Sequence, residues 1–179
     1  MLSGELELDD AYIGKGGGLR GRGTDKTPFI ACAERAKGGK LAIRVVADCS
    51  GAAYKEFADW HIADAAHIRT DDWNGAKGGL KDWEGHDPRT FDGGDEDARL
   101  PVVHHVISNF KAHVRGTYHG VTQDRLQSYA DEFCWRYNHR GMKAKFELLL
   151  HGLCQRAKKP KPEIKLLFMP QITPLEAAA

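Results

Sequence analysis

Hydrophobic and polar residues alternate along residues 4–14. Leu6 and Leu8 fall on one face of an extended chain, and three acidic residues, the last of them Asp9, fall on the other. This two-residue period is typical of a half-buried strand. The glycines that follow residue 13 would end it. The first stretch of the chain therefore predicts a strand that carries carboxylates on one face.

Two further apolar runs, residues 28–33 and 40–47, are separated by a Gly-Gly turn and predict a hairpin. The period then changes, and apolar residues at helical spacing predict a helix over 53–63. A short strand follows at 66–73. The order is βββαβ, and a crossover of this kind places the fourth strand parallel beside the first.

After a Gly- and Asp-rich segment with at most one further strand near 89–91, three stretches have helical periodicity. Their apolar stripes are Val103, Val106, Ile107, Phe110 and Val114; Leu126, Tyr129, Ala130, Phe133 and Tyr137; and Phe146, Leu149, Leu150 and Leu153. We interpret all three stripes as core. The predicted fold class is α/β, a mixed sheet followed by a helical C-terminal part.

Composition limits the number of domains. The chain has 179 residues, 41% of them hydrophobic, and a formal net charge of +1. This suits one sizeable core. We predict a single domain over residues 1–157 and a loosely ordered Pro/Lys-rich tail over 158–179. The four cysteines form no Cys-x-x-Cys pair, and no apolar run is long enough to span a membrane. We therefore expect a soluble, cytoplasmic protein.

Acidic residues mark the two strands that the crossover brings together. The first strand carries Asp9 and Asp10, and the fourth ends in Asp71 and Asp72. Carboxylates on neighbouring strands are the oxygen ligands that Mg²⁺ takes. The alternative is an edge strand whose acids are simply solvated, and the residues around Asp9 do not decide between the two.

Basic residues suggest contacts with phosphates. The Gly-rich loop at 14–23 contains Arg20 and Arg22 but lacks a phosphate-loop signature. It is either a basic finger near a phosphate backbone or a long hairpin loop. Arg136 and Arg140 could also bind phosphates, although a helix C-terminus attracts basic residues through its dipole.

Four segments resemble a known family. In chain order they are residues 7–14 (ELDDAYIG), 70–75 (TDDWNG), 108–121 (SNFKAHVRGTYHGV) and 131–140 (DEFCWRYNHR). Together they resemble the catalytic domain of bacterial insertion-sequence transposases of the Asp-Asp-Glu superfamily, in the group whose third position can be Asn. The resemblance covers Gly4 to about Leu153 and implies a ribonuclease H-like fold.

The resemblance also assigns roles to residues. The family places the catalytic acid first in each pair, which implies that Asp9 and Asp71 bind metal. Asn109 takes the third catalytic, metal-binding position by the same match. The basic residue that follows, which would contact DNA, is either Lys111 or Arg115, and the sequence leaves this choice open.

The chemistry explains these residue types. In-line cleavage of a phosphodiester requires stabilisation of the attacking and leaving oxygens, which a pair of Mg²⁺ or Mn²⁺ ions about 4 Å apart can provide. Asn109 in place of Glu removes one negative charge from such a site. Glu132 is the alternative third ligand, although a structural ion pair within its helix would also explain it. The expected activity is metal-dependent strand cleavage and strand transfer.

The resemblance implies DNA partners, both transposon ends and target, and a homo-oligomer at the bacterial nucleoid. Full-length relatives carry a DNA-reading segment ahead of the first catalytic strand, whereas Met1 precedes that strand directly here. We therefore expect a truncated element or a catalytic domain. Two alternatives remain: an inactive remnant that only binds DNA, and a histidine metal site that includes His105, His113 and His119.

Overall fold

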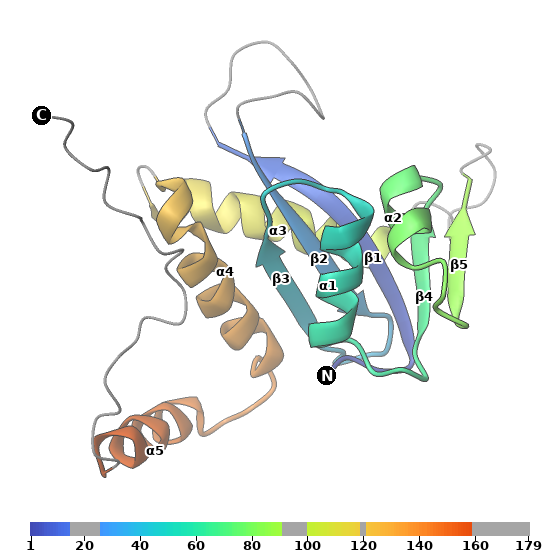
Figure 1. Cartoon of the computed structure of the whole chain (residues 1–179). Helices are drawn as coiled ribbons and strands as arrows, with labels where there is room; N and C mark the ends of the chain where they lie inside the picture. Colours follow the sequence, from blue (N-terminus) through green and yellow to red (C-terminus); the bar gives the residue numbers. More distant parts are fainter. Residues whose placement is uncertain (15–25, 91–99, 119–120, 159–179) are drawn as a thin grey trace, which may run out of the picture. The chain divides into compact units, whose positions relative to one another are not determined.

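The computed structural model describes residues 1–14, 26–90, 100–118 and 121–158. Two compact units are present, residues 1–141 and residues 142–179 (Figure 1). The predicted boundary at residue 157 stays a prediction. Arg20, Arg22 and His119 lie outside the described residues, as does nearly all of the tail predicted at 158–179.

A mixed five-stranded sheet forms the centre of the first unit. Its strands are β1 (Glu5–Ile13), β2 (Thr27–Glu34), β3 (Leu41–Val45), β4 (His67–Asp71) and β5 (His86–Arg89). Their order across the sheet is β3-β2-β1-β4-β5. The first three strands are antiparallel, and β4 pairs in parallel with both β1 and β5. The prediction of an α/β fold with a ribonuclease H-like βββαβ core is confirmed.

Three details differ from the sequence-based expectation. β1 is the central strand and not an edge strand, because the crossover places β4 on its free side. The fifth strand ends at Arg89 and includes Pro88, which an edge strand tolerates because it need not donate a hydrogen bond on its outer side. A short helix, α2 (Asn74–Gly79), follows β4.

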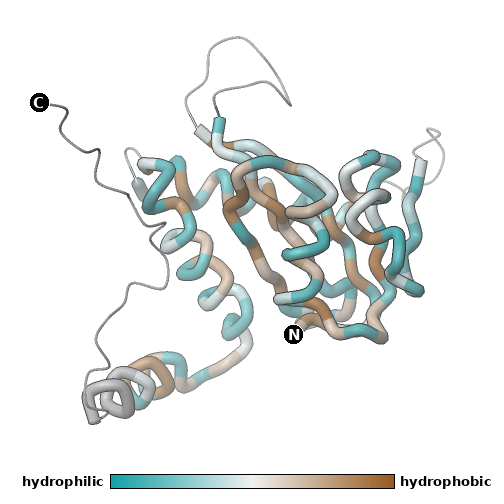
Figure 2. Tube along the Cα trace, viewed as in Figure 1, coloured by the Kyte–Doolittle hydropathy of each residue, from teal (hydrophilic) through white to brown (hydrophobic). Residues whose placement is uncertain are grey.

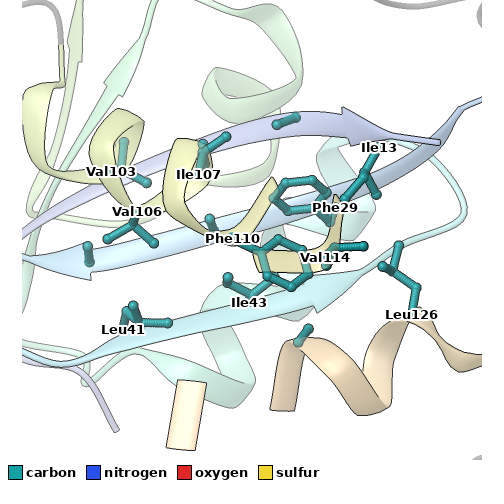
Figure 3. Packing of buried hydrophobic residues seen from close by; sticks show 14 of the residues in the cluster. Ile13, Phe29, Leu41, Ile43, Val103, Val106, Ile107, Phe110, Val114 and Leu126 are labelled. Atoms are coloured by element: carbon teal, nitrogen blue, oxygen red, sulfur yellow. The ribbon is translucent and has the colours of Figure 1, made fainter. Parts of the chain in front are cut away.

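Helices cover both faces of the sheet (Figure 1). Helices α1 (Gly51–His61) and α2 pack on one face, which β1 meets with Leu6 and Leu8. Helices α3 (Pro101–Thr117) and α4 (Gln123–Asn138) pack on the other. There the apolar stripe of α3 lies against the strands, with Phe110 beside Phe29 at 5.3 Å between ring centroids (Figure 3). The predicted stripe of α3 is therefore core.

The free edge of β3 is sealed by two amide side chains from α4. The Asn138 side chain accepts a hydrogen bond from Leu41 N at 2.8 Å and donates one to Leu41 O at 2.9 Å. Gln127 likewise accepts from Val45 N at 2.7 Å and donates to Ile43 O at 3.3 Å. An exposed strand edge is a template for unwanted pairing, and α4 removes it by imitating a neighbouring strand.

We expect Asn138→Ala to destabilise the first unit by about 1–3 kcal/mol, because it leaves a strand donor and acceptor of Leu41 without partners. The measurement is the midpoint of urea unfolding. Ser128→Ala, an exposed substitution on the same helix, is the control and should leave the midpoint unchanged. Equal midpoints for the two variants would show that Asn138 does not seal the edge.

The second unit contains α5 (Lys145–Lys158). The expectation that its apolar stripe is core was wrong for the residues described. Phe146 is 72% exposed, and Leu149 and Leu150 are exposed as well (Figure 2). The reason is that α5 belongs to a compact unit separate from the sheet. Among the described residues, no helix is both long and apolar enough to cross a membrane.

Candidate metal and DNA site

Two carboxylates stand level on neighbouring strands. β1 pairs with β4 in a parallel register that joins Glu5 to His67, an offset of 62 residues (67 − 5). Asp71 follows Asp9 by the same 62 residues (71 − 9). Alternation along each strand directs both side chains to the face that α3 covers. The fold therefore brings Asp9 and Asp71 side by side, at the carboxyl end of β4.

Neighbouring groups register this negative charge. Burial raises the pKa of Tyr54 well above its usual range, and the charges of Asp10, Asp9 and Asp71 raise it further. The hydrogen bond to Asp9 raises the pKa of His104, partly opposed by burial, and the charge of Asp71 adds to the increase. Both Asp9 and Asp71 are thus within electrostatic reach of the same two side chains.

The second acid of each pair has a structural partner. The Tyr54 hydroxyl donates a hydrogen bond to Asp10 Oδ1 at 2.7 Å, on the α1 side of the sheet. Lys77 Nζ lies 2.9 Å from Asp72 Oδ1, and this lysine holds the pKa of Asp72 below its usual range. Asp10 and Asp72 therefore contribute contacts to α1 and α2.

One flank of α3 faces Asp9. His104 Nε2 lies 3.0 Å from Asp9 Oδ2. Burial lowers the pKa of Lys111, as does the neighbouring charge of Arg115, while Asp9 acts in the opposite direction. Because seven residues make about two helical turns, His104 and Lys111 share this flank. Of the two basic residues left open by the sequence, Lys111 is the one whose titration responds to Asp9.

Asn109 lies on a different flank of α3. Five residues after His104, its side chain is rotated by about 140° around the helix axis. It is exposed and lies 3.0 Å from the ring of His105, between Asn109 Nδ2 and His105 Nε2. The structure therefore brings together Asp9, Asp71 and His104, and it places Asn109 elsewhere. A spacing of seven residues to Lys111 is the signal that would have selected His104 from the sequence.

Glu132, the alternative third ligand, lies within a contact network on α4. Arg136 Nη2 approaches Glu132 Oε1 at 2.8 Å, and the Tyr118 hydroxyl donates to Glu132 Oε2 at 2.9 Å. The Tyr118 bond is the main cause that lowers the pKa of Glu132. Arg140 stacks over Tyr137 at 3.9 Å from the ring centroid. Arg136 and Arg140 thus have local partners and remain candidates for phosphate contacts. His113 packs against the rings of Tyr118 and Phe133.

A third carboxylate, Glu7, escaped the sequence analysis because alternation alone placed it on a polar face. It is fully buried. Glu7 Oε2 accepts hydrogen bonds from Val102 N at 2.7 Å and Val103 N at 2.9 Å, and Glu7 Oε1 lies 3.2 Å from Arg35 Nη1. A carboxylate at a helix N-terminus satisfies free N–H groups and the helix dipole. Glu7 therefore fixes the start of α3 two residues before His104.

The donor set suits a hydrated divalent ion. Asp9 is only 16% exposed in its side chain, and its Oδ1 accepts from Asp10 N at 2.8 Å, which leaves Oδ2 on the α3 side. Asp71 Oδ1 accepts from Trp73 N at 3.3 Å. Over the described ranges, no three His, Cys, Asp or Glu side chains form a complete metal site by themselves. Mg²⁺ needs only one or two carboxylates, since waters and substrate phosphates complete its shell.

The fold and the level carboxylates define the class of transposase catalytic domains. Residues 1–138 match the family model of the ISXO2-like transposase domain. The chain therefore belongs to the ISXO2-like transposase domain family, which acts on DNA through nuclease and transferase chemistry in general. No curated protein matches the chain.

Proposed function

We propose that this chain cleaves and transfers DNA strands in a reaction that depends on Mg²⁺ or Mn²⁺, as the catalytic domain of an insertion-sequence transposase. The observation that carries the proposal is the level placement of Asp9 and Asp71 on β1 and β4, in a chain of this family. Two such carboxylates would hold two ions, and bound ions supply charge stabilisation to both oxygens that exchange at phosphorus.

The remaining residues have simpler roles. Lys111 places a cation beside the carboxylates, where a scissile phosphate would bind. Arg115, Arg136 and Arg140, together with Arg20 and Arg22, are the proposed contacts to the DNA backbone. Action on transposon ends and target would require more than one copy of the chain, so we propose a homo-oligomer on DNA. By resemblance, Asn109 is the third site residue.

The test is nicking of supercoiled plasmid by the chain in Mn²⁺ and in Mg²⁺. We expect Asp71→Asn to lower the nicking rate by at least about 100-fold, because removal of one group that stabilises transition-state charge costs about 10²–10³ in rate. Asp72→Asn is the matched control, since Asp72 is exposed and bound to Lys77, and it should keep its nicking rate.

Equal nicking by the unchanged chain and by Asp71→Asn would overturn the proposal. Absence of nicking in either metal, together with binding to DNA that weakens steeply as salt is raised, would instead favour the inactive remnant. Binding through phosphates releases counterions, so the slope of affinity against salt reports how many basic residues are engaged.

A further inference from the structure

We infer that His104, and not Asn109, supplies the third side chain of the metal site, so that the site combines two carboxylates with one imidazole nitrogen. This inference rests on the proposed function, because it takes Asp9 and Asp71 as ligands. It replaces a carbonyl oxygen donor by a nitrogen donor. It therefore changes which divalent ion the site prefers.

The distance between His104 and Asp9 fits ligands of one ion. Neighbouring ligands of an octahedral ion, each about 2.1 Å from the metal, lie about 3.0 Å apart. His104 Nε2 and Asp9 Oδ2 are 3.0 Å apart. The same separation suits a direct hydrogen bond in the metal-free protein. An ion can therefore enter between the two atoms with little movement of either residue.

The phase of α3 on the sheet excludes Asn109 from this position. Val103, Val106 and Phe110 are fully buried against the sheet, and Figure 3 shows their side chains directed at β2 and β3. Turning the helix by about 140° to bring Asn109 to Asp9 would expose all three. It would also break the hydrogen bonds that Glu7 accepts at the helix start. His104 already occupies the flank that faces Asp9.

The chemistry of the donor predicts the metal preference. Mg²⁺ favours hard oxygen ligands, and affinity for imidazole rises along the first-row transition metals from Mn²⁺ onward. A site with a histidine ligand should therefore gain more from Mn²⁺ than a site built from oxygen donors alone. His104→Glu restores an oxygen donor with a negative charge. That variant should bind Mg²⁺ more tightly than the unchanged chain.

The decisive experiment uses Mn²⁺ alone as the probe, by electron spin echo spectroscopy and calorimetric titration. Coordination by imidazole gives a ¹⁴N modulation of the Mn²⁺ signal. We expect this modulation in the unchanged chain and in His105→Gln, the matched control at the next residue of α3. His104→Gln should abolish the modulation and weaken Mn²⁺ binding by about tenfold or more. Asn109→Ala should keep both.

The outcomes separate this inference from the proposed function. If Asp9→Asn fails to weaken Mn²⁺ binding, the metal site itself is wrong. If Asp9→Asn weakens binding but the unchanged chain shows no ¹⁴N modulation, the metal site stands and His104 is not its ligand. A loss of Mn²⁺ affinity in Asn109→Ala, with none in His104→Gln, would also overturn the inference. A His104→Glu variant that binds Mg²⁺ no better than His104→Gln would contradict it as well.

Discussion

Asp9→Asn should lower Mn²⁺-dependent nicking of plasmid DNA by on the order of 10³-fold, at the upper end of the range for loss of one charge-stabilising group. Asp9 is placed to have the largest effect because it lies on the central strand, between Asp71 on β4 and His104 on α3. The substitution keeps the size of the side chain and removes only its charge. The expected loss is therefore in metal binding.

The same substitution should not destabilise the metal-free protein. The charges of Asp9, Asp10 and Asp71 all act on Tyr54, so the three carboxylates lie close enough to repel one another. Neutralising Asp9 relieves that repulsion, at the cost of its contact with the half-exposed His104. We expect an unchanged or slightly raised melting temperature without metal.

Metal should restore the difference between the two proteins. A ligand that binds only the folded state at 100 times its dissociation constant stabilises that state by about 2.7 kcal/mol. Saturating Mn²⁺ should therefore raise the melting temperature of the unchanged chain but not that of Asp9→Asn. Asp10→Asn is the matched control, because Asp10 faces Tyr54 on the other side of the sheet. A Mn²⁺ response lost in Asp10→Asn but kept in Asp9→Asn would reverse our assignment.

Glu7→Ala should cost about 3–5 kcal/mol of unfolding free energy, the range for removal of one partner from a buried ion pair. Two losses add here. Arg35, which is mostly buried, loses its carboxylate, and the amides of Val102 and Val103 lose their acceptor at the start of α3. A domain of ordinary stability has about 5–15 kcal/mol in total, so this variant should be close to unfolding at 37 °C.

The measurement is the midpoint of urea unfolding, with Glu5→Ala as the matched control. Glu5 belongs to the same strand, but it is half exposed, and its partner Arg69 is 3.6 Å away. Exposed ion pairs contribute about 0–1 kcal/mol, so Glu5→Ala should shift the midpoint little. Glu7→Gln should fall between the two variants, because its amide oxygen can still accept from α3. Similar midpoints for Glu7→Ala and Glu5→Ala would refute the buried role of Glu7.

Local patterns predicted the elements of the sheet well. The alternation at Leu6 and Leu8 and the helical stripe from Val103 to Val114 gave the correct element types, since each period follows from backbone geometry alone. The stripe of α5 was misread, because an apolar stripe does not say whether a partner surface belongs to the same compact unit. The spacing between Asp9 and Asp71 was visible in the sequence, but its equality with the strand register was not.

The sequence by itself determined that this chain forms a βββαβ sheet with acids on its first and fourth strands, because alternation and turn chemistry act between near neighbours. The tertiary structure decided three further matters: β1 is central, Glu7 is a buried cap, and the flank of α3 that faces Asp9 carries His104. The physical reason is that the rotation of a helix on a sheet is set by the packing of its whole apolar stripe. A turn of 140° separates two polar residues that are only five positions apart.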